Sequence, residues 1–443
     1  MQTASKKVIN GWAMYDWANS VYNLVITTTF FPIYYLGVTG DGNNATKTDY
    51  IDFLWFRHIP NSSLYDYTLA VAFLIVAISS PILSSIADYR GNKKNFMKFF
   101  VLMGSLSCIG FYFFKDIHTL GLATILLITA TVGFWGSLVF YNSYLPEIAA
   151  PEDRDRISAK GFSYGYIGSV LLQIVGFVIV MLAGDDKEAQ SNAVKITFIL
   201  VGVWWFGFAQ ITFTRLPKVI PAGINNNNRN IFSNGFHELA KVIKEIKTLP
   251  VLLLFLGAFF FYNMGVQTVM LIATTFGSET LKLDTTTLII TVVIIQLVAI
   301  VGAIVMSRLS DHYGNIQVLL FVVALWIGIC VYSYFFLINK WQFFGVASVV
   351  GLVMGGIQSL SRSTYSKLMP LTKDTASYFS FFDVSEKIAI VIGMFSFGFI
   401  NHLTGSMRNS ILALVVFFAI GFLFLLRVLA KQKQILQTVS GAN

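Results

Sequence analysis

The chain has 443 residues, of which 56% are hydrophobic and only 12% are charged. Soluble domains are about 25% charged, so this chain has too few charged side chains to cover a surface in water. Apolar residues run along the whole sequence, which excludes a soluble globular enzyme, a disordered chain and a fibrous repeat. A single membrane anchor does not explain the pattern either, and we expect a polytopic membrane protein.

Twelve apolar segments are long enough to cross a bilayer as helices, which takes about 20 residues each. Only helices and closed barrels satisfy the backbone in lipid, and these segments are too long and too evenly apolar for barrel strands. The sequence therefore predicts an all-α membrane protein with twelve transmembrane helices. In chain order the segments lie near 12–36, 68–87, 96–114, 119–142, 160–183, 194–214, 250–276, 287–309, 316–337, 341–360, 377–400 and 409–429.

The formal net charge of +9 is distributed unevenly. With the N-terminus placed inside, the inner segments hold most of the 31 Lys and Arg residues, which predicts that both termini are cytoplasmic. The basic residues do not cluster on a soluble module, so we expect no nucleic-acid partner. Cys108 and Cys330 both lie in apolar segments, where cysteine behaves as a small hydrophobe, and we expect no metal site.

The second half of the chain repeats features of the first. The sequence SSIADYRGNKK follows the second span and MSRLSDHYGN follows the eighth, at a distance close to half the chain length. We therefore predict two pseudo-symmetric six-helix bundles, residues 1–214 and 250–443. The segment 215–249 between them has an amphipathic period, which favours a linker helix on the inner membrane surface. Transporters built from two such halves bind their solute between the halves, near mid-membrane.

The box after the second span, Asp88 to Lys94, resembles the loop signature of the major facilitator superfamily. Ser84 stands where that signature has glycine. The opening of the first span, GWAMYDWANS at 11–20, is similar to that of the vacuole-effluxer-like branch. Further similar motifs are YLPEIA at 144–149, RDR at 154–156, YN with GVQT in the seventh span and GGIQSLSRS at 355–363.

This branch includes the autophagy-related vacuolar amino-acid effluxer of yeast. The resemblance implies the major facilitator fold and export of amino acids or similar solutes. The chain also departs from the branch: Met264 stands where an acid is common, and DVSEK at 383–387 stands where N-x-S-G-K is usual. These differences indicate that the solute and the coupling ion can differ from those of relatives.

Polar residues in the first span form one helical stripe. Asp16, Asn19, Asn23 and Thr27 follow the spacing i, i+3, i+7 and i+11, and the aromatic residues Tyr15 and Tyr22 flank them. A charge at mid-membrane costs about 2.5–3.5 kcal/mol, so a retained acid needs a reason. Two interpretations stay open. Either the stripe faces the pore and Asp16 binds substrate or a proton, or Asp16 is a structural salt-bridge or hydrogen-bond anchor near the inner surface.

The seventh span offers Asn263 and Gln267 at i and i+4. Amides there could bind the ammonium or carboxylate of a zwitterion, or they could simply join helices through hydrogen bonds. The remaining candidates for lining a cavity are polar residues in or near other spans, namely Asn142, Gln173 and Gln358.

The eleventh span holds Asp383, Glu386 and Lys387, whose spacing puts them on one helix face. If Asp383 pairs with Lys387, Glu386 remains as a free acid. Our hypothesis is that Glu386 or Asp16 carries a coupling proton, with Asp383 and Lys387 as partners. The alternative is a static buried network. Arg362 could reach the surface or pair with one of these acids.

The two repeated boxes are predicted to be gates on the inner side. A carboxylate at a helix end can bond backbone N–H groups of the other half and meet nearby basic residues. The second box lacks the basic tail of the first, so we expect a weaker contact there. The predicted gating residues are Asp88, Arg90, Gly91, Lys93, Asp311, Gly314 and Arg362.

These patterns favour a secondary active transporter that moves a small polar solute by alternating access, as a proton-coupled symporter or antiporter. Alternatives are an exporter of amphipathic drugs or lipids and a non-transporting membrane receptor or sensor. The five His residues fall in loops or at span ends and no phosphate-binding loop is present, so we expect neither an enzyme nor a cofactor. We expect a monomer in a bacterial inner membrane.

Overall fold

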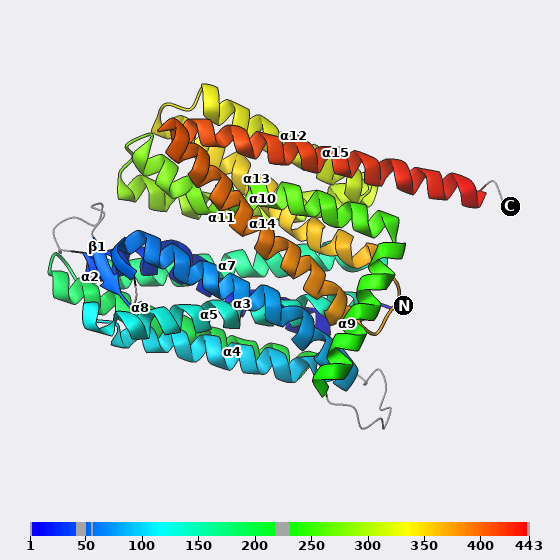
Figure 1. The fold of residues 1–443 in the computed structure, drawn as a ribbon, viewed down its shortest axis with the longest axis horizontal. Helices are drawn as coiled ribbons and strands as arrows, with labels where there is room; N and C mark the ends of the chain where they lie inside the picture. Colours follow the sequence, from blue (N-terminus) through cyan, green and yellow to red (C-terminus); the bar gives the residue numbers. More distant parts are fainter. Residues whose placement is uncertain (1, 41–49, 55, 218–230, 441–443) are drawn as a thin grey trace.

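The computed structural model describes residues 2–40, 50–54, 56–217 and 231–440. Within these residues, helices form two bundles that lie side by side (Figure 1). The first bundle contains α1 (Lys6–Val21), the π-helix η1 (Tyr22–Phe30), α2 (Phe31–Thr39), α3 (Asn61–Arg90), α4 (Lys93–Gly110), α5 (Leu120–Ser143), α7 (Arg154–Leu182) and α8 (Lys187–Arg215). The second contains α10 (Pro250–Glu279), α11 (Thr285–Tyr313), α12 (Asn315–Phe335), α13 (Lys340–Leu368), α14 (Thr375–Thr404) and α15 (Met407–Ser440).

The prediction of an all-α membrane fold with twelve spans is confirmed. The first span is continuous and consists of α1, η1 and α2 together. In the described part of the chain, 11 helical segments are long and apolar enough to cross a membrane. The remaining span is α14, which has sufficient length but carries Asp383, Glu386 and Lys387 in its interior. Large apolar side chains such as Leu74, Phe99 and Phe321 are exposed on the bundles, as expected for surfaces that face lipid.

Short elements connect the spans at both ends. They are the strands β1 (Tyr50–Phe53) and β2 (Phe56–Pro60), which pair antiparallel, the 3-10 turns η2 (Phe111–Phe113), η3 (Ile117–Thr119) and η4 (Pro151–Asp153), and the short helix α6 (Leu145–Ile148). Both ends of the described chain lie at the same end of the molecule (Figure 1), which we call the terminal end. The opposite end, which holds β1 and β2, is called the loop end.

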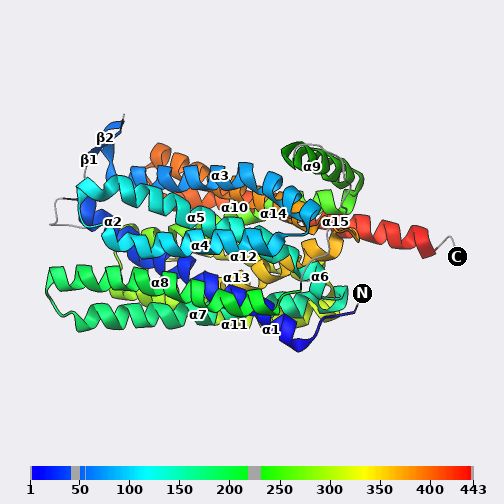
Figure 2. The same cartoon turned by 90° about the horizontal axis from the view of Figure 1, so that it is seen from below.

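Each bundle has its own core of buried apolar and aromatic side chains. The bundles meet along α3 and α5 with α14, and along α7 with α11 and α13. The helix α9 (Ile231–Thr248) lies within the expected linker and contacts α3 of one bundle and α14 of the other (Figures 1 and 2). Its apolar face buries Val242 and Ile246, whereas residues 218–230 of the same linker lie outside the described part.

The closest packing between neighbouring helices uses glycines. A Cβ atom added to Gly355 of α13 would lie 2.0 Å from the carbonyl oxygen of Ala299 on α11, a backbone atom that cannot move alone. Small residues at such crossings let membrane helices approach closely.

We therefore expect Gly355→Ala to destabilise the protein by about 1–3 kcal/mol through overpacking. Gly345→Ala is the matched control, because that glycine lies on the same helix with nothing within 4 Å of its added Cβ. Thermal unfolding of both variants in detergent checks the prediction. Equal melting temperatures would contradict the close packing of α11 and α13.

Candidate transport cavity and its closure

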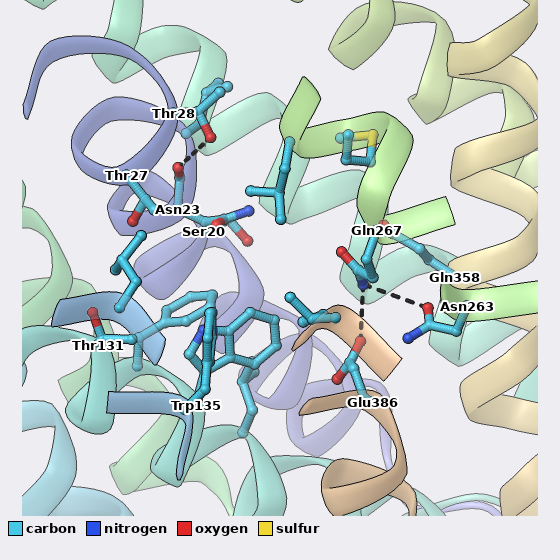
Figure 3. A pocket seen from close by; sticks show the side chains of 18 of the residues that line it. Ser20, Asn23, Thr27, Thr28, Thr131, Trp135, Asn263, Gln267, Gln358 and Glu386 are labelled. Carbon is cyan, nitrogen blue, oxygen red and sulfur yellow. Dashed lines mark hydrogen bonds between the residues drawn. The ribbon is translucent and has the colours of Figure 1, made fainter. Parts of the chain in front are cut away.

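A cavity of about 660 Å³ lies between the two bundles. Its wall includes residues of the first span, α3, α5 and α7 from one bundle and of α10, α13 and α14 from the other. Figure 3 shows Ser20 and Asn23 on one side of this space and Gln267 with Glu386 on the other. The lining extends to Asp66 near the loop end. Because residues of both bundles line the cavity, a polar solute held in it would contact both.

The first span changes from an α-helix to a π-helix where it lines the cavity. The Thr28 hydroxyl donates to the Asn23 carbonyl and the Thr29 hydroxyl to the Leu24 carbonyl, each five residues back and each at 2.8 Å (Figure 3 shows the first bond). The segment ends just before Pro32, which has no backbone N–H to continue a hydrogen-bond ladder. Sequence periodicity predicted a regular helix here. π-helical turns are rare and are frequent at functional sites.

Most of the polar residues predicted from the sequence reach the cavity, including the whole stripe of the first span. Tyr15, Tyr22 and Gln173 do not: all three are buried in the first bundle. Tyr15 and Tyr22 are offset from Asp16 by about 100° and about 120° around the helix, on the same side, which turns their rings away from the cavity. The predicted residues that line the cavity are Asp16, Asn19, Asn23, Thr27, Asn142, Asn263, Gln267, Gln358, Arg362 and Glu386.

An ion pair between the bundles lies where the cavity approaches the terminal end. Arg362 Nη1 of α13 lies 3.2 Å from Asp16 Oδ2 of α1, and the Tyr141 hydroxyl donates to the same carboxylate oxygen at 2.7 Å. The guanidinium also donates to the Ser158 carbonyl at 2.8 Å and lies 4.1 Å from the ring centroid of Phe162. Asp16 therefore takes part in the salt bridge that one of the two sequence interpretations expected.

A second contact between the bundles lies nearer the terminal end. Asp88, in the last turn of α3, accepts hydrogen bonds from the Ser377 N–H at 2.7 Å, the Ser377 hydroxyl at 2.8 Å and the Ala376 N–H at 3.2 Å. These donors belong to the first turn of α14, where the helix dipole favours a negative charge. Lys93 Nζ lies 2.9 Å from Asp88 and 2.6 Å from Glu147.

Gly91 makes this arrangement possible because its φ of 64° ends α3 in the left-handed region and reverses the chain toward Lys93. Arg90, predicted to take part in the same contact, is exposed instead. The Lys93 ammonium donates to the Thr375 hydroxyl as well, so this basic side chain also joins the two bundles.

The contact near the second box is made by a different acid from the one predicted. Asp311 is exposed, and the acid of the corresponding contact is Asp155 on α7. Asp155 accepts from Lys367 Nζ at 2.6 Å, from the Ser310 hydroxyl at 2.8 Å and from Asn315 Nδ2 at 2.7 Å. Ser310 faces α7, and a step of about 100° to the next residue turns Asp311 toward water. Gly314, with a φ of 85°, ends α11 at the position that corresponds to Gly91 at the end of α3.

The charged cluster of α14 is a network that reaches both bundles. Lys387 Nζ lies 2.8 Å from Asp383 Oδ1, 3.1 Å from Glu386 Oε2 and 3.5 Å from the ring centroid of Trp135 on α5. The Ser80 hydroxyl of α3 donates to Asp383 at 3.2 Å. Glu386 is thus not the free acid that a simple Asp383–Lys387 pair would leave.

The helical spacing within α14 correctly placed these three side chains together. It carried no signal for the contact with Trp135 of the other bundle. Of the three charged residues, Glu386 lines the cavity, whereas Asp383 and Lys387 lie behind the lining.

Comparison with known proteins identifies the family. The family described as "Vacuole effluxer Atg22 like" matches residues 4–435. The chain belongs to this family. It is 31% identical over 420 residues to the uncharacterized MFS-type transporter YxiO of Bacillus subtilis, covering 94% of this chain and 93% of YxiO. It is 23% identical to Autophagy-related protein 22 of Saccharomyces cerevisiae, covering 91% and 88% of the two chains.

Solved structures show that this Atg22-like chain has the major facilitator fold. The transporter FucP in the outward conformation superposes with a TM-score of 0.68 at 13% identity, covering 95% of this chain and 97% of FucP. The human organic anion transporter MFSD10 superposes with a TM-score of 0.69 at 10% identity, covering 96% and 100%. The Atg22-like chain is therefore a multi-pass integral membrane protein with a transporter fold.

The motifs that resemble the Atg22-like family converge on the interface between the bundles, toward the terminal end. Asp16 comes from the opening motif, Asp155 from the RDR motif and Arg362 from the motif in α13. In the same region Arg154 Nη1 donates to the Ser366 carbonyl at 2.6 Å, and the Ser158 hydroxyl donates to the Ser359 carbonyl at 2.8 Å. The two residues of each contact are far apart in the sequence, and their common location is the interface between the bundles.

Proposed function

We propose that the protein is a secondary active transporter that moves a small polar solute, such as an amino acid, by alternating access. The observation that carries this proposal is the cavity between the bundles, which has amide and carboxylate groups on its wall. Among the described residues, two ion pairs between the bundles, Arg362 with Asp16 and Lys367 with Asp155, lie toward the terminal end. Two halves that rock around such a site expose it first to one side of the membrane and then to the other.

The arrangement of contacts supports a conformation that is open to the outside. The contacts made by Asp16, Asp88 and Asp155 all lie toward the terminal end, and the charge distribution of the sequence favours a cytoplasmic position for that end. In this proposal the three contacts form the inner gate, and they break when the cavity opens to the cytoplasm of a bacterial cell.

Protons are the proposed coupling ion, and the α14 cluster is the proposed coupling site. Glu386 lines the cavity and shares Lys387 with Asp383, and Asp383 in turn contacts Ser80 of the other bundle. A proton that binds to either acid weakens its attraction to Lys387 and so changes contacts between the bundles. A monomer is sufficient for this mechanism, because every group in it belongs to one chain.

Uptake by proteoliposomes tests the proposal. The purified protein is reconstituted and supplied with a mixture of radiolabelled amino acids, with and without an imposed pH gradient. We expect protein-dependent uptake that the gradient stimulates. Absence of uptake for every amino acid, in either direction of the gradient, would contradict the proposed solute class.

A cavity variant links transport to the site. We expect Asn263→Leu to lower uptake at least about tenfold, because a lost hydrogen bond to a charged solute group is worth about 1.5–3 kcal/mol. Gln210→Leu is the matched control, since Gln210 is exposed on α8 and donates to the Phe206 carbonyl of its own helix. Equal uptake by the two variants would show that Asn263 does not contact the solute.

A further inference from the structure

The charged residues on the cavity wall are mostly acidic. Four charged side chains line the cavity among the described residues, namely Asp16, Asp66, Glu386 and Arg362. Arg362 is paired with Asp16, so it does not balance the other two acids. Behind the wall, Lys387 is shared between Asp383 and Glu386. The cavity therefore has an excess of negative charge.

Glu386 has unused capacity to accept hydrogen bonds. Its Oε1 accepts from Gln267 Nε2 at 3.0 Å and its Oε2 from Lys387 at 3.1 Å. A carboxylate offers about four lone-pair positions, so about half of them are unused. The side chain is 18% exposed and lines the cavity, which leaves these positions accessible to a donor from a solute. An ammonium group fits this acceptor best because it supplies three donors and a positive charge.

Two buried amides on the same wall have unused donors. Asn263 Nδ2 and Asn19 Nδ2 have no hydrogen-bond partner among the described residues, although their side chains are 5% and 1% exposed. Asn263 belongs to α10 and Asn19 to α1, so the two donors come from different bundles. Leaving a buried donor unpaired costs about 1–3 kcal/mol, which an acceptor group on a bound solute would offset.

We propose that the cavity selects amino acids of net positive charge. Glu386 binds an ammonium group of the solute, and Asn19 and Asn263 donate to its carboxylate. The second ammonium of a cationic amino acid balances the excess negative charge, whereas an anionic solute would add to it. Low-dielectric walls strengthen this selection because they focus the field of the acids within the cavity. This inference rests on the proposed transport of amino acids and names their charge class.

Binding of a charge series to the wild-type protein tests the inference without any substitution. L-lysine, L-leucine and L-glutamate are titrated against the purified protein by calorimetry, with thermal shift as a second readout. We expect lysine to bind at least about tenfold more tightly than leucine, and glutamate to bind most weakly. Leucine binding as tightly as lysine would overturn the charge selection and leave the proposed function intact. Absence of binding by all three would also overturn the charge selection, whereas the proposed function is tested by uptake of the full amino-acid mixture.

Two variants separate direct contact from the general field. We expect Glu386→Gln to weaken lysine binding at least tenfold, since it removes the proposed ammonium partner. Asp66→Asn should weaken it by a smaller factor that disappears at high salt, because Asp66 is exposed near the loop end and acts only through its charge.

Glu279→Gln is the matched control, an exposed acid at the end of α10 that is absent from the cavity wall. We expect it to bind lysine like the wild type. Melting temperatures of all variants report whether they are folded. A folded Glu386→Gln protein with wild-type lysine affinity would overturn the assignment of Glu386.

Discussion

Replacement of Arg362 by methionine is expected to destabilise the protein strongly and to abolish transport. Arg362 is 3% exposed and its guanidinium lies 3.2 Å from Asp16, so its removal leaves a buried carboxylate without its ion-pair partner. Removing one partner of a buried ion pair costs about 3–5 kcal/mol. The same side chain bonds Ser158 across the bundle interface, so the substitution also removes a contact between the bundles. Thermal unfolding and proteoliposome uptake measure the two effects.

A double variant distinguishes an unpaired charge from lost packing. Asp16→Asn in the Arg362→Met background removes the uncompensated carboxylate, and we expect it to recover a large part of the lost stability but not transport. Arg308→Met is the control, because Arg308 is exposed on α11. If the double variant is no more stable than Arg362→Met alone, the ion pair is not the reason for the loss.

The sequence was sufficient to predict the parts of the molecule that depend on local composition. Hydropathy located all twelve spans, and the repeated boxes indicated two halves, because each signal lies within one short segment. The spacing of Asp383, Glu386 and Lys387 placed them on one helix face for the same reason. The polar stripe that begins at Asp16 was also local, and the structure places it on the cavity wall.

Contacts between the halves could not be read in the same way. The pairing of Asp16 with Arg362 joins residues far apart in the sequence, and it exists because the bundles are closed at the terminal end. The duplication even suggested a wrong residue: Asp311 is exposed, and Asp155 of the opposite bundle supplies the acid instead. The first span changes to a π-helix at Tyr22, where threonine hydroxyls bond carbonyls five residues back. A sequence period of 3.6 residues does not predict this change.

Asp88→Asn is expected to open the terminal end. The carboxylate accepts three hydrogen bonds from Ala376 and Ser377 of the other bundle, and it is paired with Lys93. An amide keeps one acceptor oxygen but loses the charge that the N-terminus of α14 and Lys93 both favour. We expect the closed arrangement to lose about 2–3 kcal/mol of stability relative to the open one, which raises the ratio of open to closed molecules by roughly 30- to 150-fold.

Thiol labelling at Ser366→Cys reports this opening. Ser366 is fully buried on α13 next to Arg154 of the first bundle, so it becomes accessible when the bundles separate. The native cysteines, Cys108 and Cys330, are buried and contribute little background. Labelling should be much faster in the Asp88→Asn background and unchanged with Asp311→Asn, since Asp311 is exposed in this conformation. Equal acceleration by both substitutions would mean that the two boxes close the terminal end symmetrically, contrary to the contacts made by Asp88 and Asp155.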